Sequence, residues 1–252
     1  MISVAVAGAL GRMGGEVIQA VNAAGDMQVV GGVDVKSGPG VFADLRQLIQ
    51  ATHPQVLVDF TVADAAAANA MTALELGVRP VIGTSGMSQE QQERIAARAQ
   101  ETKTGAFIAP NFALGAVLMM YFARIGARYF DSAEVIELHH DQKIDAPSGT
   151  AVKTAQEMAE AHAKAFASNV PDKEPLPGGR GAEWQGVRIH SVRLPGLVAH
   201  QEVIFGAQGQ TLVIRHDTSD RTAFMPGVLI AIREVLKLDR LVVGLDNLLG
   251  LG

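Results

Sequence analysis

Short apolar segments alternate with helical patterns through the first part of the chain, and this alternation restricts the fold more than any other feature of the sequence. Continuous apolar runs that end in turn residues are typical of strands buried on both faces. Strands that alternate with helices form parallel βαβ units, so we predict an α/β fold with a doubly wound parallel sheet. The predicted strands are 2–8, 27–34, 56–61, 79–86 and 104–111, and the predicted helices between them are 11–25, 63–77 and 88–101, the last with Ser88 as N-cap.

The pattern changes near Asn111, where a second domain is expected to begin. Its strands are closely spaced and include a hairpin turn near Gly206 and Gly209, which predicts an antiparallel or mixed sheet. The segment 167–186 is rich in Pro and Gly without periodicity, so we predict a long loop that forms a lid or an insertion. The predicted helices are 113–130, 148–166 and 222–238, the last of which could return to the first domain, and the predicted strands are 133–140, 187–196, 199–206 and 210–218.

Composition excludes several classes of function. The net charge of −5 argues against general nucleic-acid binding, because the chain has no strong basic field. The absence of cysteine removes disulfides, zinc–thiolate sites and cysteine nucleophiles. The N-terminus has no signal-peptide pattern, and the longest apolar run is interrupted by Arg124 and is too short to span a bilayer. We therefore expect a cytoplasmic protein that does not enter membranes.

Three glycines, Gly8, Gly11 and Gly14, lie between the first predicted strand and the first predicted helix. A turn without Cβ atoms lets a pyrophosphate approach the backbone, and the helix N-terminus supplies N–H donors. Asp34 follows the second strand, where a partner for ribose hydroxyls belongs. The alternative is that these glycines only permit close packing of helix and strand.

The same residues bear on the choice of nucleotide. Asp34 is expected to accept hydrogen bonds from both ribose hydroxyls of NAD and to repel a 2′-phosphate. Lys36 and Arg12 are cations that could offset this repulsion. We therefore predict NADH as a cofactor and leave NADPH open. Two further turns, 83–86 and 109–112, end parallel strands at the edge where ligands bind, although either turn could be an ordinary one.

His139 and His140 are adjacent at the end of a predicted strand and close to Lys143. In a regular strand the two imidazoles would point to opposite faces, so they can face one ligand only if the strand ends there. The following Pro-Ser-Gly-Thr turn opens a helix, with Ser148 or Thr150 as a cap. Together these groups form a cationic pocket that contains an acid/base imidazole.

Three interpretations of this stretch compete. The histidines could be incidental residues at the end of a surface strand. They could bind a metal with Asp141 or Asp145, but adjacent histidines seldom converge on one metal and Lys143 would repel it, so we predict no metal site. The third interpretation, general acid catalysis on an anionic substrate, uses every residue of the stretch.

The segment ELHHDQKIDAPSGTA (137–151) resembles the signature of the 4-hydroxy-tetrahydrodipicolinate reductase (dihydrodipicolinate reductase) family. Other segments, among them VAGALGRMG, VIGTSG, IAPNFALGAV and IRHDTSDRTAFMPGV, resemble family segments in the same order, so the resemblance covers nearly the whole chain. It implies an N-terminal Rossmann-type dinucleotide-binding domain at 1–109 and 218–252. It also implies an α+β domain with a mixed sheet at 110–217, which binds the substrate and builds a homotetramer.

The resemblance also implies roles for single residues. His139 matches the catalytic proton donor and Lys143 its partner in acid catalysis. Lys143, His140, Gly149 and Thr150 match the groups that contact the substrate carboxylates. The nucleotide contacts match Gly8, Ala9, Leu10, Gly11, Arg12, Met13, Asp34, Gly83, Thr84, Ser85, Ala109, Pro110, Asn111 and Phe112, of which Leu10 and Ser85 differ from the residues common in the family.

The implied activity is reduction of a cyclic dicarboxylate, 4-hydroxy-tetrahydrodipicolinate, by NADH or NADPH with loss of water, in the diaminopimelate route to lysine. Either His139 or Lys143 could deliver the proton in the slow step. One alternative is another nicotinamide-dependent dehydrogenase of amino-acid metabolism, although the branch that needs a thiol is excluded by the absence of cysteine. A second alternative is a nucleotide sensor without catalysis, against which the intact set of His139, His140 and Lys143 argues.

Overall fold

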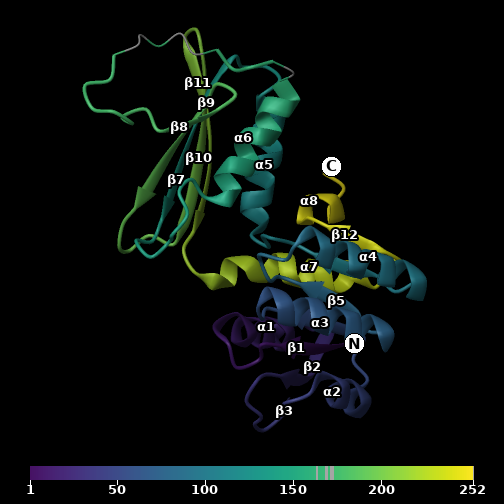
Figure 1. Cartoon of the computed structure of the whole chain (residues 1–252). Coiled ribbons are helices and arrows are strands. Elements are labelled where there is room, and N and C mark those ends of the chain that lie inside the picture. The colour runs from purple at the N-terminus through teal and green to yellow at the C-terminus, as the bar shows by residue number, and fades with distance from the viewer. Residues whose placement is uncertain (163, 168–169, 171–172, 252) are drawn as a thin grey trace. The chain divides into compact units, whose positions relative to one another are not determined.

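The computed structural model describes residues 1–162, 164–167, 170 and 173–251 of the 252-residue chain. The chain divides into two compact units (Figure 1). Unit 1 combines Met1–Leu114 with Arg221–Gly252, and unit 2 is Gly115–Asp220. Each unit is described by itself below.

Unit 1 is built on a seven-stranded sheet in which every paired strand is parallel. This confirms the predicted doubly wound sheet. The central strands are completely buried, as the apolar run Val4–Ala7 shows, because helices cover both faces. In spatial order the strands are β12 (Leu241–Val243), β6 (Ala106–Ile108), β5 (Arg79–Ile82), β4 (Val56–Asp59), β1 (Ile2–Ala7), β2 (Met27–Val33) and β3 (Val41–Phe42).

The helices of unit 1 begin largely where their sequences predict. Ser88 caps α4 in a capping box with Gln91, as expected for Ser at this position. Four elements were not predicted, because each has at most eight residues and is too short to show a period. They are β3, α2 (Leu45–Thr52), β12 and α8 (Leu245–Leu248). The helices are α1 (Arg12–Ala23), α2 (Leu45–Thr52), α3 (Ala63–Glu75), α4 (Gln89–Thr102), α7 (Met225–Val235) and α8 (Leu245–Leu248), and a 3₁₀ turn, Arg221–Phe224, precedes α7.

Unit 2 contains a five-stranded sheet that is mixed, as predicted. β7 and β9 are parallel, and the other neighbouring strands are antiparallel. In spatial order the strands are β11 (Gln210–Thr218), β10 (Ala199–Ala207), β7 (Ser132–His139), β9 (Val187–Arg193) and β8 (Ala182–Trp184). The parallel β7–β9 pair places His139 opposite Arg193, which matters for the site described below.

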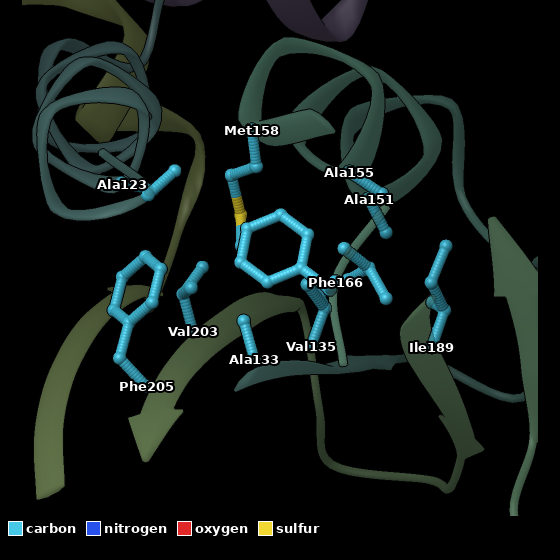
Figure 2. Close-up of a cluster of buried hydrophobic side chains, with 12 residues drawn as sticks. Ala123, Ala133, Val135, Ala151, Ala155, Met158, Phe166, Ile189, Val203 and Phe205 are labelled. Atoms are coloured by element: carbon cyan, nitrogen blue, oxygen red, sulfur yellow. The ribbon is translucent and has the colours of Figure 1, made fainter. Parts of the chain in front are cut away.

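Helices α5 (Leu114–Gly126) and α6 (Gly149–His162) lie on one face of this sheet and form a core with it (Figure 2). Phe166 lies in the middle of the cluster, with Met158 of α6 above it and Val135 of β7 below. Small residues on the helices, such as Ala123 and Ala155, let helix and sheet approach closely. The core thereby fixes the end of β7 and the start of α6 relative to each other.

Some predicted boundaries in unit 2 are wrong. β8 lies inside the segment predicted as a loop, because Gln185 and Gly186 both have positive φ and make the tight turn that pairs β8 with β9. The predicted helix 113–130 ends at Gly126. Residues 168, 169, 171 and 172 of the predicted loop lie outside the described residues.

Candidate active site

The predicted nucleotide contacts lie at one edge of the sheet in unit 1. Gly8–Met13 follow β1, Asp34 follows β2, Gly83–Ser85 follow β5 and Ala109–Phe112 follow β6. Because these strands are parallel, their carboxyl ends meet at the same edge, which is where open α/β sheets bind ligands.

The glycine turn has the geometry that the sequence predicts. Gly8 has φ +74°, a conformation that favours glycine, and Gly11 precedes α1 without any side-chain cap on the helix. A Cβ on Gly14 would lie 2.1 Å from the carbonyl oxygen of Gly8. Gly14 therefore serves close helix–strand packing, and the uncapped N-terminus of α1 keeps its N–H groups available to an anion.

Asp34 is fixed beside this turn. One of its carboxylate oxygens accepts a hydrogen bond from Leu10 N at 2.9 Å and the other from Val35 N at 2.8 Å. A pocket of about 360 Å³ opens next to it, lined among others by Asp34, Arg46, Thr61 and Asn69. The pocket offers a carboxylate, a guanidinium and neutral polar groups to a ligand.

The residues after β5 and β6 range from exposed, such as Ser85 and Pro110, to buried, such as Phe112. Phe112 is 2% exposed and packs against the rings of Phe60 and Phe107. Its side chain therefore belongs to the core, so that only its backbone is free to contact a ligand. Thr84 is also buried, and the side chain of Asn111 accepts a hydrogen bond from Ala113 N.

Asp59 is a residue that sequence reasoning missed. It is 1% exposed at the end of β4 and accepts hydrogen bonds from Thr61 N, Thr61 Oγ1 and Asn69 Nδ2. Thr84 Oγ1 lies 3.5 Å from the same carboxylate. Asp59 thus links the loops after β4 and β5, and a lone acidic residue inside an apolar run was the signal that could have revealed it.

In unit 2, β7 ends at His139. The sequence required the strand to end at the histidine pair if both imidazoles were to face one ligand. The side chain of His139 is 15% exposed, whereas His140 lies beyond the strand and is exposed. The backbone N–H of Lys143 donates to the carbonyl of His140, which closes the turn after the strand.

Lys143 forms an ion pair with Asp145, with 2.7 Å between Nζ and Oδ1. The hydrogen bond from Lys143 is the main reason that the pKa of Asp145 lies below its usual range, and the backbone N–H of Gly149 lowers that pKa further. Asp145 therefore contacts two of the groups that the family resemblance assigns to a substrate carboxylate.

The turn before α6 presents a helix N-terminus. Ser148 is the cap, because its Oγ accepts a hydrogen bond from Ala151 N at 3.2 Å. A Cβ on Gly149 would meet nothing within 4 Å, so Gly149 faces open space. The first turn of α6 contains no acidic residue. Its N–H groups and partial positive charge are suited to a carboxylate.

Glu137 is the second site residue that sequence reasoning missed. Its side chain is fully buried, and it accepts hydrogen bonds from His139 Nδ1 at 2.5 Å and from both terminal nitrogens of Arg193 at 2.8 and 2.9 Å. Burial opposes ionisation, but the hydrogen bonds from His139, Arg193 and Ser191 outweigh it and lower the pKa of Glu137 to about 2. Glu137 is thus an ionised carboxylate at neutral pH. The signal in the sequence was its position two residues before His139, on the same side of the strand.

These contacts join the residues of unit 2 into one network. Glu137 binds His139 and Arg193, and Arg193 Nη2 donates to the carbonyl of Asp145 at 2.6 Å. Asp145 in turn binds Lys143. Within the part of the chain that the structure describes, no group of three or more His, Asp or Glu side chains is arranged to bind a metal ion. The described residues also include no helix long and apolar enough to cross a membrane.

Comparison with known families and proteins identifies the chain. The family model "Dihydrodipicolinate reductase, N-terminus" matches residues 2–112, and "Dihydrodipicolinate reductase, C-terminus" matches residues 115–249. The 4-hydroxy-tetrahydrodipicolinate reductase of Moorella thermoacetica is 52% identical, with 98% of each chain covered. The enzyme of the same name from Bacillus subtilis is 45% identical, again with 98% of each chain covered.

Solved structures agree with this assignment. A dipicolinate-bound dihydrodipicolinate reductase from Paenisporosarcina sp. TG-14 matches with a TM-score of 0.91 and 44% identity, over 98% of this chain and 99% of that one. An amine dehydrogenase from Mycobacterium smegmatis has a TM-score of 0.66 at 14% identity and shares the fold alone. The chain therefore belongs to the dihydrodipicolinate reductase family, oxidoreductases that reduce 4-hydroxy-tetrahydrodipicolinate on the route to lysine.

Proposed function

We propose that the family reaction proceeds in this chain with His139 as proton donor, Lys143 as its cationic partner, and NADH or NADPH as hydride source. The observation that carries this proposal is the network in unit 2 that joins an imidazole, a lysine and a helix N-terminus. The substrate is a small dicarboxylate, and these are the groups that bind carboxylates and transfer protons.

The edge of the sheet in unit 1 fits a pyridine nucleotide. The turn at Gly8 and Gly14 leaves no room for a Cβ at Gly14, and α1 starts without a side-chain cap. These features suit a pyrophosphate, and the pocket beside Asp34 suits the adenosine ribose. We propose contacts from Gly8–Met13, Asp34, Gly83–Ser85 and Ala109–Phe112, with Phe112 acting through its backbone.

Asp34 bears on the choice between the two nucleotides. A carboxylate accepts hydrogen bonds from ribose hydroxyls and repels a 2′-phosphate. Arg46 lines the same pocket, but it pairs with Glu75 at 2.9 Å, which offsets its charge. We therefore propose that the chain uses NADH, and that any use of NADPH depends on Arg12 and Lys36.

The residues of unit 2 bind and protonate the substrate. Lys143 and the N–H groups at Gly149 and Thr150 bind its carboxylates, and His140 adds a further donor at the surface. A nicotinamide held at the sheet edge of unit 1 would supply a hydride to C4 of the ring, from which the hydroxyl leaves as water. The displaced electron pair moves toward the ring nitrogen and C3, and a proton must then arrive from the protein. His139 donates a proton from Nε2, because Nδ1 is already bonded to Glu137. An imidazole is suited to this step, because one ring nitrogen can donate a proton while the other stays bonded to the protein.

The assignment of residues 1–109 and 218–252 to nucleotide binding, and of 110–217 to substrate binding and assembly, belongs to the same proposal. So do a homotetramer and a cytoplasmic location. The apolar side chain of Val213 on β11 is 50% exposed and points to the face opposite that of the core residue Phe205, which supports assembly through the sheet of unit 2.

The proposal is tested by following the oxidation of NADH and of NADPH, with substrate generated by the upstream synthase. We expect turnover with NADH, and a comparison of kcat/KM between the two nucleotides measures the preference. Nucleotide binding without turnover would support a nucleotide sensor. Turnover with NADPH but not with NADH would overturn the cofactor assignment.

The glycine turn gives a second prediction. Gly14→Ala is expected to weaken NADH binding about tenfold, because a Cβ 2.1 Å from the Gly8 carbonyl oxygen must displace the turn that we propose for the pyrophosphate, and overpacking of this kind costs ~1–3 kcal/mol. Gly15→Ala is the matched control, since a Cβ there would meet nothing within 4 Å. Fluorescence titration with NADH measures both. Equal affinity in the two variants would show that the turn does not bind the nucleotide.

A further inference from the structure

We propose that Glu137 and Arg193 are positioning residues for His139 and for the carboxylate-binding turn. Glu137 orients the imidazole, and Arg193 holds Glu137 and the following loop in place. This inference rests on the proposed function, because it assigns to His139 a proton that leaves from Nε2.

The strand pairing explains why these three side chains meet. Glu137 and His139 are two residues apart in β7, so their side chains leave the strand on the same side. Arg193 lies opposite His139 on the parallel strand β9. The guanidinium therefore reaches back to Glu137, although the two residues are 56 positions apart in the chain.

The carboxylate of Glu137 uses both oxygens. Oε2 accepts from His139 Nδ1 and from Arg193 Nη1, and Oε1 accepts from Arg193 Nη2 and from Ser148 N at 3.2 Å. The last bond connects Glu137 to the cap of α6, next to Gly149 and Thr150. A single buried carboxylate thus holds the imidazole and the turn that we propose for a substrate carboxylate.

The bond to Glu137 determines which nitrogen keeps a proton in the neutral ring of His139, so that a proton given to the substrate leaves the doubly protonated ring from Nε2. A carboxylate can only accept, so Nδ1 must donate, and Nε2 is the nitrogen left to act on a substrate. Arg193 has a second effect through its charge. Its bidentate pairing with Glu137 opposes transfer of the imidazole proton to the carboxylate, so that the proton remains on His139.

A purely structural ion pair would not require bonds from its members to the loop and the turn of the site. Arg193 also donates to the backbone carbonyls of Val192 and Asp145, and the loop that carries Lys143 is thereby tied to the same guanidinium. Glu134 and His190 provide a comparison within the same sheet. They form one bond of 2.8 Å between half-exposed side chains, with no arginine on the carboxylate among the contacts of the described residues.

The decisive variant is Glu137→Gln. Glutamine keeps the shape of glutamate but has one acceptor oxygen instead of two. Its NH₂ group, itself a donor, must therefore face two donors, either those of His139 and Arg193 or those of Arg193 and Ser148. We expect kcat to fall about tenfold, the size of one hydrogen bond to a charged group, with KM changed less than about threefold. Glu134→Gln is the matched control and should keep the wild-type kcat.

Two readouts separate positioning from a general loss of structure. In the background of His139→Ala, Glu137→Gln should lower kcat no further, because its effect on kcat passes through the imidazole and its effect on the turn would appear in KM. The ¹⁵N spectrum should show the neutral ring of His139 protonated at Nδ1 in the wild type, and this preference should weaken in Glu137→Gln, because an amide oxygen accepts less strongly than a carboxylate. Independent, additive losses or an unchanged ¹⁵N spectrum would overturn the inference.

The outcomes also distinguish this inference from the proposed function. Near-normal kcat in His139→Ala contradicts the proposed function itself. A large loss in His139→Ala together with wild-type kcat in Glu137→Gln contradicts the inference alone. If Glu137→Gln does not fold, Arg193→Lys replaces it. Lysine keeps the positive charge but cannot form the two parallel hydrogen bonds that the guanidinium makes to a carboxylate. We then expect a severalfold fall in kcat that disappears in the background of His139→Ala, while the ¹⁵N spectrum keeps the preference for Nδ1 because the carboxylate remains. A wild-type kcat, or a loss that adds to that of His139→Ala, would overturn the inference.

Discussion

Replacing His139 with alanine is expected to lower kcat about 100-fold or more while KM changes only modestly, the size expected for loss of a general acid. The imidazole is held by Glu137 at the end of β7, so alanine removes the proton donor without removing Lys143 or the turn at Gly149. Steady-state rates of NADH oxidation give both parameters.

His190→Ala is a matched control for this experiment. His190 lies on the neighbouring strand β9 and also binds a glutamate, Glu134, but it takes no part in the network around Glu137. We expect its kcat to equal that of the wild type. If His139→Ala retained a near-normal kcat, the proton donor would have to be another group.

The sequence predicted the large elements correctly because their signals are local. A buried parallel strand needs only a continuous apolar run, and Val4–Ala7 is such a run. By contrast, β12 is a short strand whose existence depends on a partner elsewhere in the chain. Leu241 pairs with Ala106, a contact that no local pattern contains.

The same distinction applies to the candidate site. His139, Lys143 and the turn before α6 lie within one short stretch, so their proximity could be predicted from spacing. Arg193 could not be placed beside Glu137, because the register of β7 and β9 brings them together. The ion pair between Lys143 and Asp145 was also missed, since the sequence alone indicated Asp145 only as an unfavoured metal ligand.

The fold by itself does not define the reaction. The amine dehydrogenase from Mycobacterium smegmatis shares the architecture at 14% identity. The reaction depends on particular side chains, and for this chain we propose the group at the end of β7 and the start of α6. The contacts of Glu137 show that this group is a connected unit, so that a change in one member is expected to alter the others.

Lys143→Ala is the second variant with a large expected effect. We expect kcat/KM to fall about 100-fold, with KM raised and kcat lowered, because a charge-assisted hydrogen bond to a carboxylate contributes ~1.5–3 kcal/mol. In this structure Lys143 pairs with Asp145, so a substrate carboxylate must share or replace that contact. Lys143→Arg should have a KM between those of the wild type and Lys143→Ala, since arginine keeps the positive charge.

Lys153→Ala is the matched control, because Lys153 lies on α6 in an exposed ion pair with Glu157 at 3.4 Å and should leave both parameters unchanged. An unchanged KM in Lys143→Ala would show that Lys143 does not bind the substrate. The same data decide which residue delivers the proton. If His139 delivers the proton, kcat must fall further in His139→Ala than in Lys143→Ala. KM must then rise further in Lys143→Ala than in His139→Ala. The reverse order in kcat would assign the proton to Lys143 and leave His139 as the group that orients the substrate.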